Sequence, residues 1–229
     1  MPFIKQLDLL KAVKDPKWHP DGVIEGNRRK IVTLIELGGK DFRTPEMVMR
    51  LKEYWKPSKD DILYVINLDG IDVMTPSATK ILVESASDIA SECKIPIIFT
   101  NVREMARESL ESESCRCNPP KILWIMNERG EAHLVGQVPN KVQELLNLLE
   151  EKGAASASQI AAQEEGENSK KSIGNLSVYL QKLFNAGLVG REKVTALDRD
   201  DAERGWTYIY KTAPTIQRNS SPKSYIKKP

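Results

Sequence analysis

The clearest hydrophobic pattern in the chain lies in its C-terminal third. Ile173, Leu176, Leu180 and Leu183 recur at the spacing of one helix face, and Gly187 follows as a residue that commonly ends helices. We therefore predict an amphipathic helix from about residue 172 to residue 186. Periodicity alone fits an ordinary surface helix equally well, so the role of this helix depends on the elements around it.

Shorter patterns flank this helix on both sides. The predicted elements are, in chain order, helices at 142–149 and 158–163, a turn at 164–169, and two strands at 189–195 and 206–211. Ser156 and Ser158 are both available to cap the second helix. The two strands are rich in β-forming side chains and can pair as a hairpin. The C-terminal part is therefore predicted as three helices followed by a hairpin.

The N-terminal part alternates strand patterns with helix patterns. The predicted elements are a helix within residues 1–14, a strand at 30–37, a helix opened by Thr44 and Pro45, a strand at 61–69, a helix from Thr75 and Pro76 to about residue 90, a strand at 95–99, a charged helix at 103–113, a loop at 115–120, a strand at 121–126, a turn at 127–130 and a short strand at 132–136. The strand at 61–69 is almost continuously apolar, as expected of a strand covered on both faces. An α/β fold follows from this order.

The two Thr-Pro pairs give the sharpest local prediction. A threonine that caps a helix, followed by a proline at the first helical position, is a common way for a helix to begin. We therefore expect Thr44 and Thr75 to be N-caps and Pro45 and Pro76 to open their helices.

Length and charge indicate two domains with different partners. At 229 residues the chain can form two small domains, each burying a core of its own. Residues 1–150 carry 21 basic and 23 acidic side chains, whereas residues 151–229 carry 13 basic and 9 acidic ones. We place an α/β domain at 1–138, a helical domain with the hairpin at 139–213, and a flexible basic tail at 214–229.

Several functional classes lack support in the sequence. No apolar run approaches the twenty residues that a membrane span needs, and the N-terminus lacks a signal-peptide core, so we expect a cytoplasmic protein without membrane contact. Cys115 and Cys117, with only His19 and His133 in the chain, fall short of a zinc site. Without nucleotide-binding or hydrolase motifs we expect no metal, no cofactor and no enzymatic activity.

The C-terminal residues resemble a known family of DNA-binding domains. The segments SASQIAAQ, SIGNLSVYLQKLFNAGLVGRE and WTYIYK are similar to the winged helix-turn-helix domain of MarR- and ArsR-type bacterial regulators. The family signature S-x-x-L-x-x-L-x-x-x-G-L-V is matched at Ser177, Leu180, Leu183, Gly187, Leu188 and Val189. The resemblance covers about eighty residues, and it implies a winged helix whose third helix enters double-stranded DNA, commonly as a homodimer on a symmetric site.

The third helix carries side chains suited to that role. Lysines at its start suit phosphates, and short polar groups away from its apolar stripe suit base edges. The predicted DNA-binding residues are Lys170, Lys171, Ser172, Asn175, Ser177, Tyr179 and Lys182.

The N-terminal part resembles a second family. The run ILYVINLDGIDVMTPSATKILVESASDIASECKIPIIFTNV is similar to the STAS domain of anti-sigma-factor antagonists and of anion-transporter tails. That family places a strand ending in Asp, a short loop and a phosphorylatable Ser or Thr at a helix start, which implies phosphorylation at Thr75 or Ser77. The family's Asp-Ser-Ser-Gly is Met74-Thr75-Pro76-Ser77 here, with the acid missing. A flavodoxin-like or Rossmann-like sheet is the alternative fold.

Two functions follow from these resemblances. The first is a DNA-binding transcriptional regulator whose STAS-like domain senses a small ligand or docks a regulatory protein partner. The alternative is an interaction adaptor in a sigma-factor or kinase pathway that does not bind DNA. The predicted hairpin tip bears on this choice, because its acids outnumber its bases and would be repelled by phosphate. These side chains are Asp198, Asp200, Asp201 and Glu203 against Arg199 and Arg204.

Overall fold

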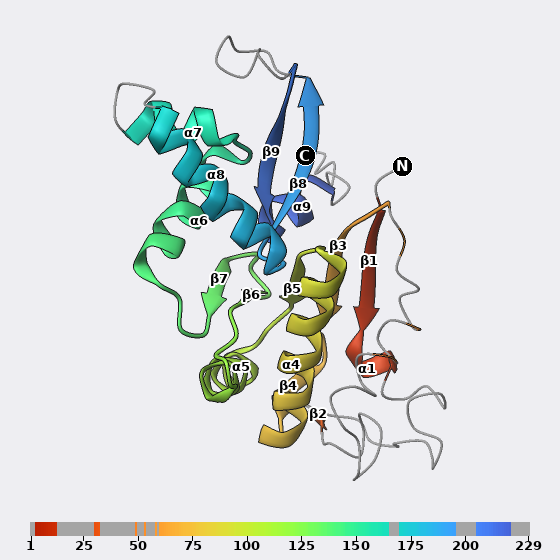
Figure 1. Ribbon diagram of the computed structural model, residues 1–229. Coiled ribbons are helices and arrows are strands. Elements are labelled where there is room, and N and C mark those ends of the chain that lie inside the picture. The colour runs from red at the N-terminus through yellow and green to blue at the C-terminus, as the bar shows by residue number, and fades with distance from the viewer. Residues whose placement is uncertain are drawn as a thin grey trace, which may run out of the picture.

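A five-stranded mixed sheet forms the centre of the molecule (Figure 1). The computed structural model describes residues 3–12, 30–32, 49, 53, 58, 60–164, 170–195 and 205–220. The sheet has the order β1 (Phe3–Asp8), β3 (Asp61–Asn67), β5 (Ile97–Thr100), β6 (Leu123–Met126) and β7 (Ala132–Val135). The first four strands run parallel and β7 runs antiparallel to β6. A second, two-stranded sheet pairs β2 (Lys30–Val32) with β4 (Ile71–Met74) in parallel.

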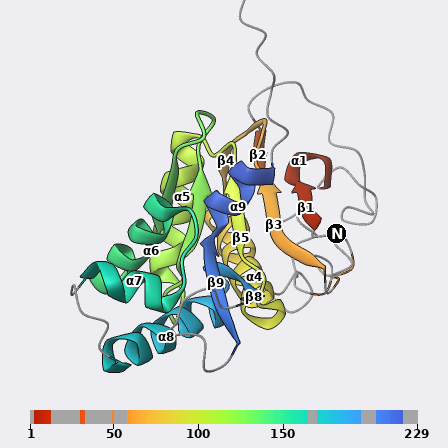
Figure 2. The same ribbon diagram turned by 90° about the horizontal axis from the view of Figure 1, so that it is seen from above.

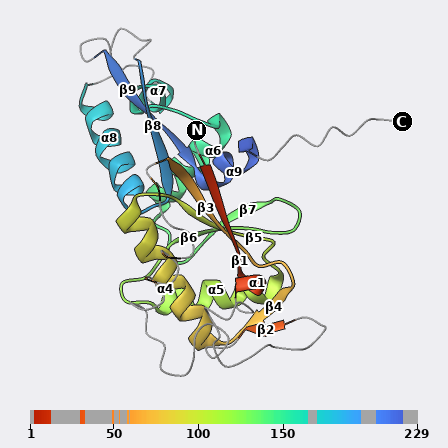
Figure 3. The same ribbon diagram turned by 90° about the vertical axis from the view of Figure 1, so that its right-hand side faces the viewer.

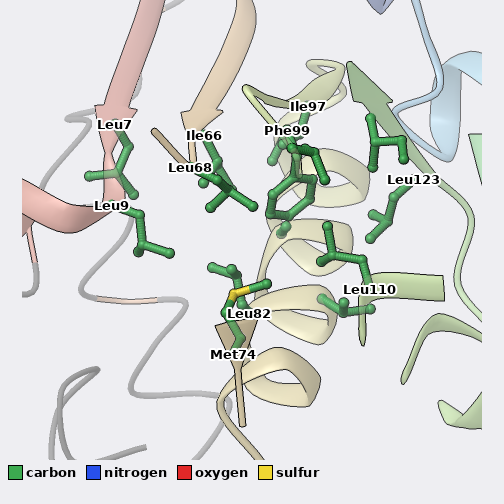
Figure 4. Packing of buried hydrophobic residues seen from close by; sticks show 14 of the residues in the cluster. Leu7, Leu9, Ile66, Leu68, Met74, Leu82, Ile97, Phe99, Leu110 and Leu123 are labelled. Carbon is green, nitrogen blue, oxygen red and sulfur yellow. The ribbon is translucent and has the colours of Figure 1, made fainter. Parts of the chain in front are cut away.

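One face of the large sheet is covered by two helices, α4 (Pro76–Cys93) and α5 (Glu104–Arg116). Successive side chains of a strand point to opposite faces, so alternate residues of β3, β5 and β6 belong to different clusters. Ile66 of β3 and Phe99 of β5 pack with Leu82 of α4 and Leu110 of α5 in the first cluster (Figure 4). These strands are buried on both faces, as the apolar run at 61–69 predicted.

The opposite face is covered by the C-terminal elements. These are α6 (Asn140–Lys152), α7 (Ala157–Glu164), α8 (Lys170–Asn185), β8 (Val189–Thr195), β9 (Trp206–Thr212) and α9 (Ala213–Ser220). Helix α9 contacts β3, β5 and β6, and Figure 2 shows it beside β3 and β5. Leu63, Val65 and Trp124 of the sheet share one hydrophobic cluster with Leu146 and Leu180 of the C-terminal helices. The expected boundary at residue 138 therefore does not separate two independent cores.

Two close contacts fix the C-terminal elements on the α/β part. The indole N–H of Trp124 in β6 donates a buried hydrogen bond to the carbonyl oxygen of Leu188, 2.8 Å away. Gly187 ends α8 with φ +69°, and a Cβ at this position would lie 2.4 Å from the Cβ of Ala90 in α4. Glycine is therefore needed here both for its backbone conformation and for close packing.

Most predicted helix starts are confirmed where the structure describes them. Thr75 has extended backbone angles at the N-cap of α4, and Pro76 is the first residue of that helix. Within the described residues the Thr75 hydroxyl accepts no cap bond from the first turn of α4. Ser156 caps α7, because its Oγ accepts from the Gln159 N–H at 3.2 Å and Gln159 Oε1 accepts from the Ser156 N–H at 2.9 Å. Thr44 and Pro45 lie outside the described residues.

Four local predictions were wrong. Residues 3–8 form strand β1 rather than a helix, because they pair in parallel with β3. Residues 71–74 form strand β4, where the resemblance to STAS domains implies a short loop between the strand at 61–69 and Thr75. Helix α5 extends to Arg116, so Cys115 is helical and not in a loop. Residues 213–220 form helix α9, whereas a flexible tail was expected from residue 214. This segment is ordered because the helix contacts the large sheet, and its Thr215 and Ile216 are buried. Among the helices that the structure describes, none is long and apolar enough to cross a membrane.

Candidate nucleic-acid interface

Helix α8 presents one row of exposed side chains to solvent. Its Leu176, Leu180 and Leu183 are buried, which turns the opposite side of the helix outward. A residue advances about 100° around a helix, so positions three and four apart share one face. Asn175, Val178 and Lys182 form such a row, and all three are exposed. In Figure 3 this helix lies beside the β8–β9 hairpin at the end of the molecule away from α5.

On the side of the row that faces α6, Tyr179 and Lys141 lie close to Lys182. The ammonium of Lys141, in the first turn of α6, lies 4.8 Å from the centre of the Tyr179 ring. The Lys182 ammonium lies 5.7 Å from the same ring, and Tyr179 remains 37% exposed. The ring therefore holds two positive charges at one edge of the exposed row through cation–π attraction.

The hairpin borders the other side of α8 with a row of alternating cations and aromatic rings. Arg191 of β8 lies 4.1 Å from the Phe184 ring of α8 and 4.2 Å from the Tyr208 ring of β9. Its Nη1 also donates to Gln181 of α8. Further along the hairpin, Lys193 lies 4.3 Å from the Trp206 ring. These contacts hold the hairpin against α8 and place two cations along their junction.

Two features bring these cations and aromatic rings together: the pairing of β8 with β9 and the packing of the rings on one another. The antiparallel register pairs Arg191 with Tyr210 and Lys193 with Tyr208, so these side chains share one hairpin face. Trp206 and Tyr208 meet edge to face with ring centres 5.0 Å apart. Burial raises the pKa of Tyr210, the innermost ring, and Arg191 partly offsets that rise. The Tyr210 hydroxyl therefore stays neutral beside Arg191 at neutral pH.

The structure places the predicted DNA-binding residues as follows. Asn175, Ser177, Tyr179 and Lys182 are all exposed. Ser177 and Tyr179 are two positions apart, about 200° around the helix, so they lie on opposite flanks and not on one flat surface. Lys170, Lys171 and Ser172 lie in the first turn of α8, but their side chains are outside the described residues, as is the acidic hairpin tip at 198–204.

Sequence reasoning missed four residues of this surface, namely Val178, Lys141, Arg191 and Lys193. Val178 is 55% exposed in the middle of the α8 row, and its spacing from Asn175 and Lys182 was the available signal. The three cations come from other elements, so only the packed structure brings them beside α8.

The two predicted phosphorylation residues lie together at the start of α4. Ser77 is exposed, Thr75 is half-buried, and their hydroxyl oxygens are 3.4 Å apart. Asp72 of the preceding strand β4 accepts a hydrogen bond from Arg103 at 2.6 Å, and Arg103 also bonds Glu128. The hydrogen bond to Asp72 is the main reason that the pKa of Arg103 is raised. Phosphorylation at Thr75 or Ser77 stays a prediction.

The cysteines were the residues considered for a metal site in the sequence. In the described part of the chain, no three His, Cys, Asp or Glu side chains gather as metal ligands would. Cys117 is buried, and burial raises the pKa of its thiol. Such a thiol is mainly protonated at neutral pH.

The chain has no detectable relative among the proteins it was compared with. No model of a known protein family matches it, and neither does any curated protein or solved structure.

Proposed function

We propose that this protein binds double-stranded DNA through α8 and the β8–β9 hairpin and acts as a transcriptional regulator. The observation that carries the proposal is the exposed row Asn175, Val178 and Lys182, bordered by cations on both sides. An asparagine amide can bond both edge positions of adenine, a valine can contact the thymine methyl group, and lysines neutralise phosphates. The major groove of DNA is wide enough to admit one α-helix, so α8 can bring this row of side chains to the base edges.

The order of the elements supports a winged helix. Helices α6, α7 and α8 precede the antiparallel pair β8 and β9, which is the arrangement implied by the resemblance to MarR- and ArsR-type regulators. In that arrangement α8 is the helix that enters the groove and the hairpin is the wing that follows the backbone. Dimerisation on a two-fold symmetric site, and ligand sensing or partner docking by the STAS-like part, complete the proposed regulator.

A titration with three variants tests the proposal. The probe is a fluorescently labelled duplex, random or selected, and the readout is anisotropy at several salt concentrations. Lys182→Ala should weaken binding to every duplex and reduce the log–log salt slope by about one, since each phosphate contact contributes about 0.9. Asn175→Ala should cost about 1–3 kcal/mol on the selected duplex and little on random DNA.

A matched control separates an interface from a general charge effect. Lys80 is an exposed lysine in the first half of α4, and Figure 1 shows that this helix begins at the end of the molecule away from α8 and the hairpin. Lys80→Ala removes the same charge as Lys182→Ala and should leave the salt slope unchanged. Equal effects of the two lysine variants would remove α8 from the interface.

One observation favours the adaptor as a second candidate. Val178 is an exposed apolar side chain in the centre of the α8 row, and such residues also anchor protein partners. The same titration decides between the two, because an adaptor would bind neither duplex even at low salt.

A further inference from the structure

One face of the β8–β9 hairpin carries two aromatic rings and two cations at the surface. Successive side chains of a strand point to opposite faces, and the register places Arg191 and Lys193 of β8 on the same face as Trp206 and Tyr208 of β9. Both rings are half-buried, and Lys193 is exposed. Solvent therefore reaches part of this surface. We call these four residues the aromatic hairpin face.

The aromatic hairpin face is positively charged. The guanidinium of Arg191 and the ammonium of Lys193 lie 4.2 and 4.3 Å from the ring centres that they cover. The side-chain acceptor of Arg191 Nη1 is the neutral amide oxygen of Gln181, and among the described residues neither cation forms an ion pair with a carboxylate. Glu192 lies between the two cations in sequence, so it belongs to the opposite hairpin face, where it pairs with Lys211 at 3.0 Å. Both positive charges can therefore attract an anionic partner.

Rings interleaved with cations suit a nucleic acid in its single-stranded form. Bases of a single strand stack on aromatic side chains, and arginines and lysines beside the rings neutralise the phosphates. In a duplex the base faces stack on one another, so a ring at the protein surface meets only groove edges and the backbone. An aromatic surface without charge would suit an apolar peptide equally well. The two cations favour a strand that carries phosphates.

We propose that the aromatic hairpin face binds single-stranded nucleic acid. A base stacks on the Trp206 ring beside Tyr208, and the exposed Lys193 side chain moves from that ring to the adjacent phosphate. Arg191 stays beside Tyr208 and donates hydrogen bonds to the next phosphate. This activity goes beyond the duplex binding proposed for α8. It shares the hairpin cations with that interface but does not use the Asn175 row, so either proposal can fail alone.

Three labelled strands of about twelve nucleotides, within the site sizes of single-strand binders, test the proposal on the full chain by anisotropy at low salt. They are oligothymidine, oligouridine, and a strand of the same length whose sugars carry no bases. The tighter of the first two should bind at least about tenfold more tightly than the strand without bases, and it identifies DNA or RNA as the preferred form. Equal affinities for all three, or binding of none, would overturn the proposal. Single-strand binding without duplex binding would remove only the function proposed for α8, and the reverse outcome would remove only this inference.

Two pairs of variants separate stacking from charge. Trp206→Ala should weaken binding of the preferred strand at least about fivefold, whereas Trp206→Phe keeps a ring and should stay near wild type. Lys193→Ala should reduce the log–log salt slope by about 0.7, the contribution of one phosphate of a single strand, and Lys80→Ala should leave the slope unchanged. Equal affinities of the two Trp206 variants, or equal slopes of the two lysine variants, would show that the hairpin face is not the site.

A second readout does not depend on the folding of Trp206→Ala. A base stacked on an indole quenches its fluorescence, so a saturating amount of the preferred strand should lower the tryptophan emission of the wild-type protein. The other tryptophan that the structure describes, Trp124, is 3% exposed and out of reach of a base. Trp206→Phe should still bind the strand and lose the quenching. Unchanged emission of wild type on binding, or equal quenching in Trp206→Phe, would contradict stacking on Trp206.

Discussion

Replacing Trp124 by phenylalanine should weaken the attachment of the C-terminal elements to the sheet. Trp124 is 3% exposed, and its indole N–H is the donor to the Leu188 carbonyl at 2.8 Å. Leu188 directly follows the glycine that ends α8, so this bond joins the sheet to the turn between α8 and the hairpin. Phenylalanine keeps an aromatic ring but has no donor.

The cost can be estimated from two contributions. A buried carbonyl that loses its donor costs about 1–3 kcal/mol, and the smaller ring leaves space worth about 1 kcal/mol more. We therefore expect Trp124→Phe to lower the free energy of unfolding by about 2–4 kcal/mol. For a chain of this size each kcal/mol lowers the melting temperature by about 2–4 °C.

The assay is urea unfolding followed by far-ultraviolet circular dichroism, with Trp206→Phe as the matched control. Trp206 is half-buried on the hairpin, where it packs edge to face on Tyr208. Phenylalanine can keep that packing, so the control should cost under about 1 kcal/mol. A Trp124→Phe variant no less stable than the control would refute the role of the Leu188 bond.

Two further predictions concern backbone packing and alkaline stability. In urea unfolding, Gly187→Ala should destabilise the protein by at least about 1 kcal/mol more than Gly130→Ala. Both glycines have positive φ, so both variants strain the backbone, but of the two only Gly187 has described atoms within 4 Å of an added Cβ. Burial raises the pKa of Tyr64 above its ordinary value near 10, so the unfolded chain releases this proton first as pH rises. The contribution of the protonated Tyr64 hydroxyl to stability is complete below about pH 10 and is lost as pH rises through the folded-state pKa. The free energy of unfolding should therefore fall above about pH 10 in wild type and fall less in Tyr64→Phe.

Local patterns were sufficient where a segment carries its own periodicity. The leucines of α8 and the Thr75-Pro76 start each act within a few residues, and the structure has them as predicted. Of the two serines available to cap α7, Ser156 is the one that does so. Strand β1 was missed because it depends on pairing with β3, more than fifty residues further along the chain. A six-residue segment has too little pattern to reveal such a partner.

The same distinction applies to helix α9 and to the candidate interface. Thr215 bonds Glu150 of α6 at 2.9 Å and Arg218 bonds the same carboxylate at 2.8 Å, contacts that cross 65 and 68 residues. The exposed positions of α8 followed from its apolar stripe, which is local. Arg191 and Lys141 joined them only through the packing of β8 and α6 on α8.

The central claim, DNA binding through α8 and the hairpin, is tested most directly by titrating the wild-type protein into a labelled random duplex at low salt. Non-specific binding by a basic surface has dissociation constants of about 10⁻⁴–10⁻⁶ M at physiological salt and tightens as salt is lowered. The account predicts saturable binding at about 20 mM salt, with the logarithm of the affinity falling linearly with the logarithm of salt concentration. No change in anisotropy up to about 100 µM protein would contradict it, because even sequence-independent contacts would then be absent.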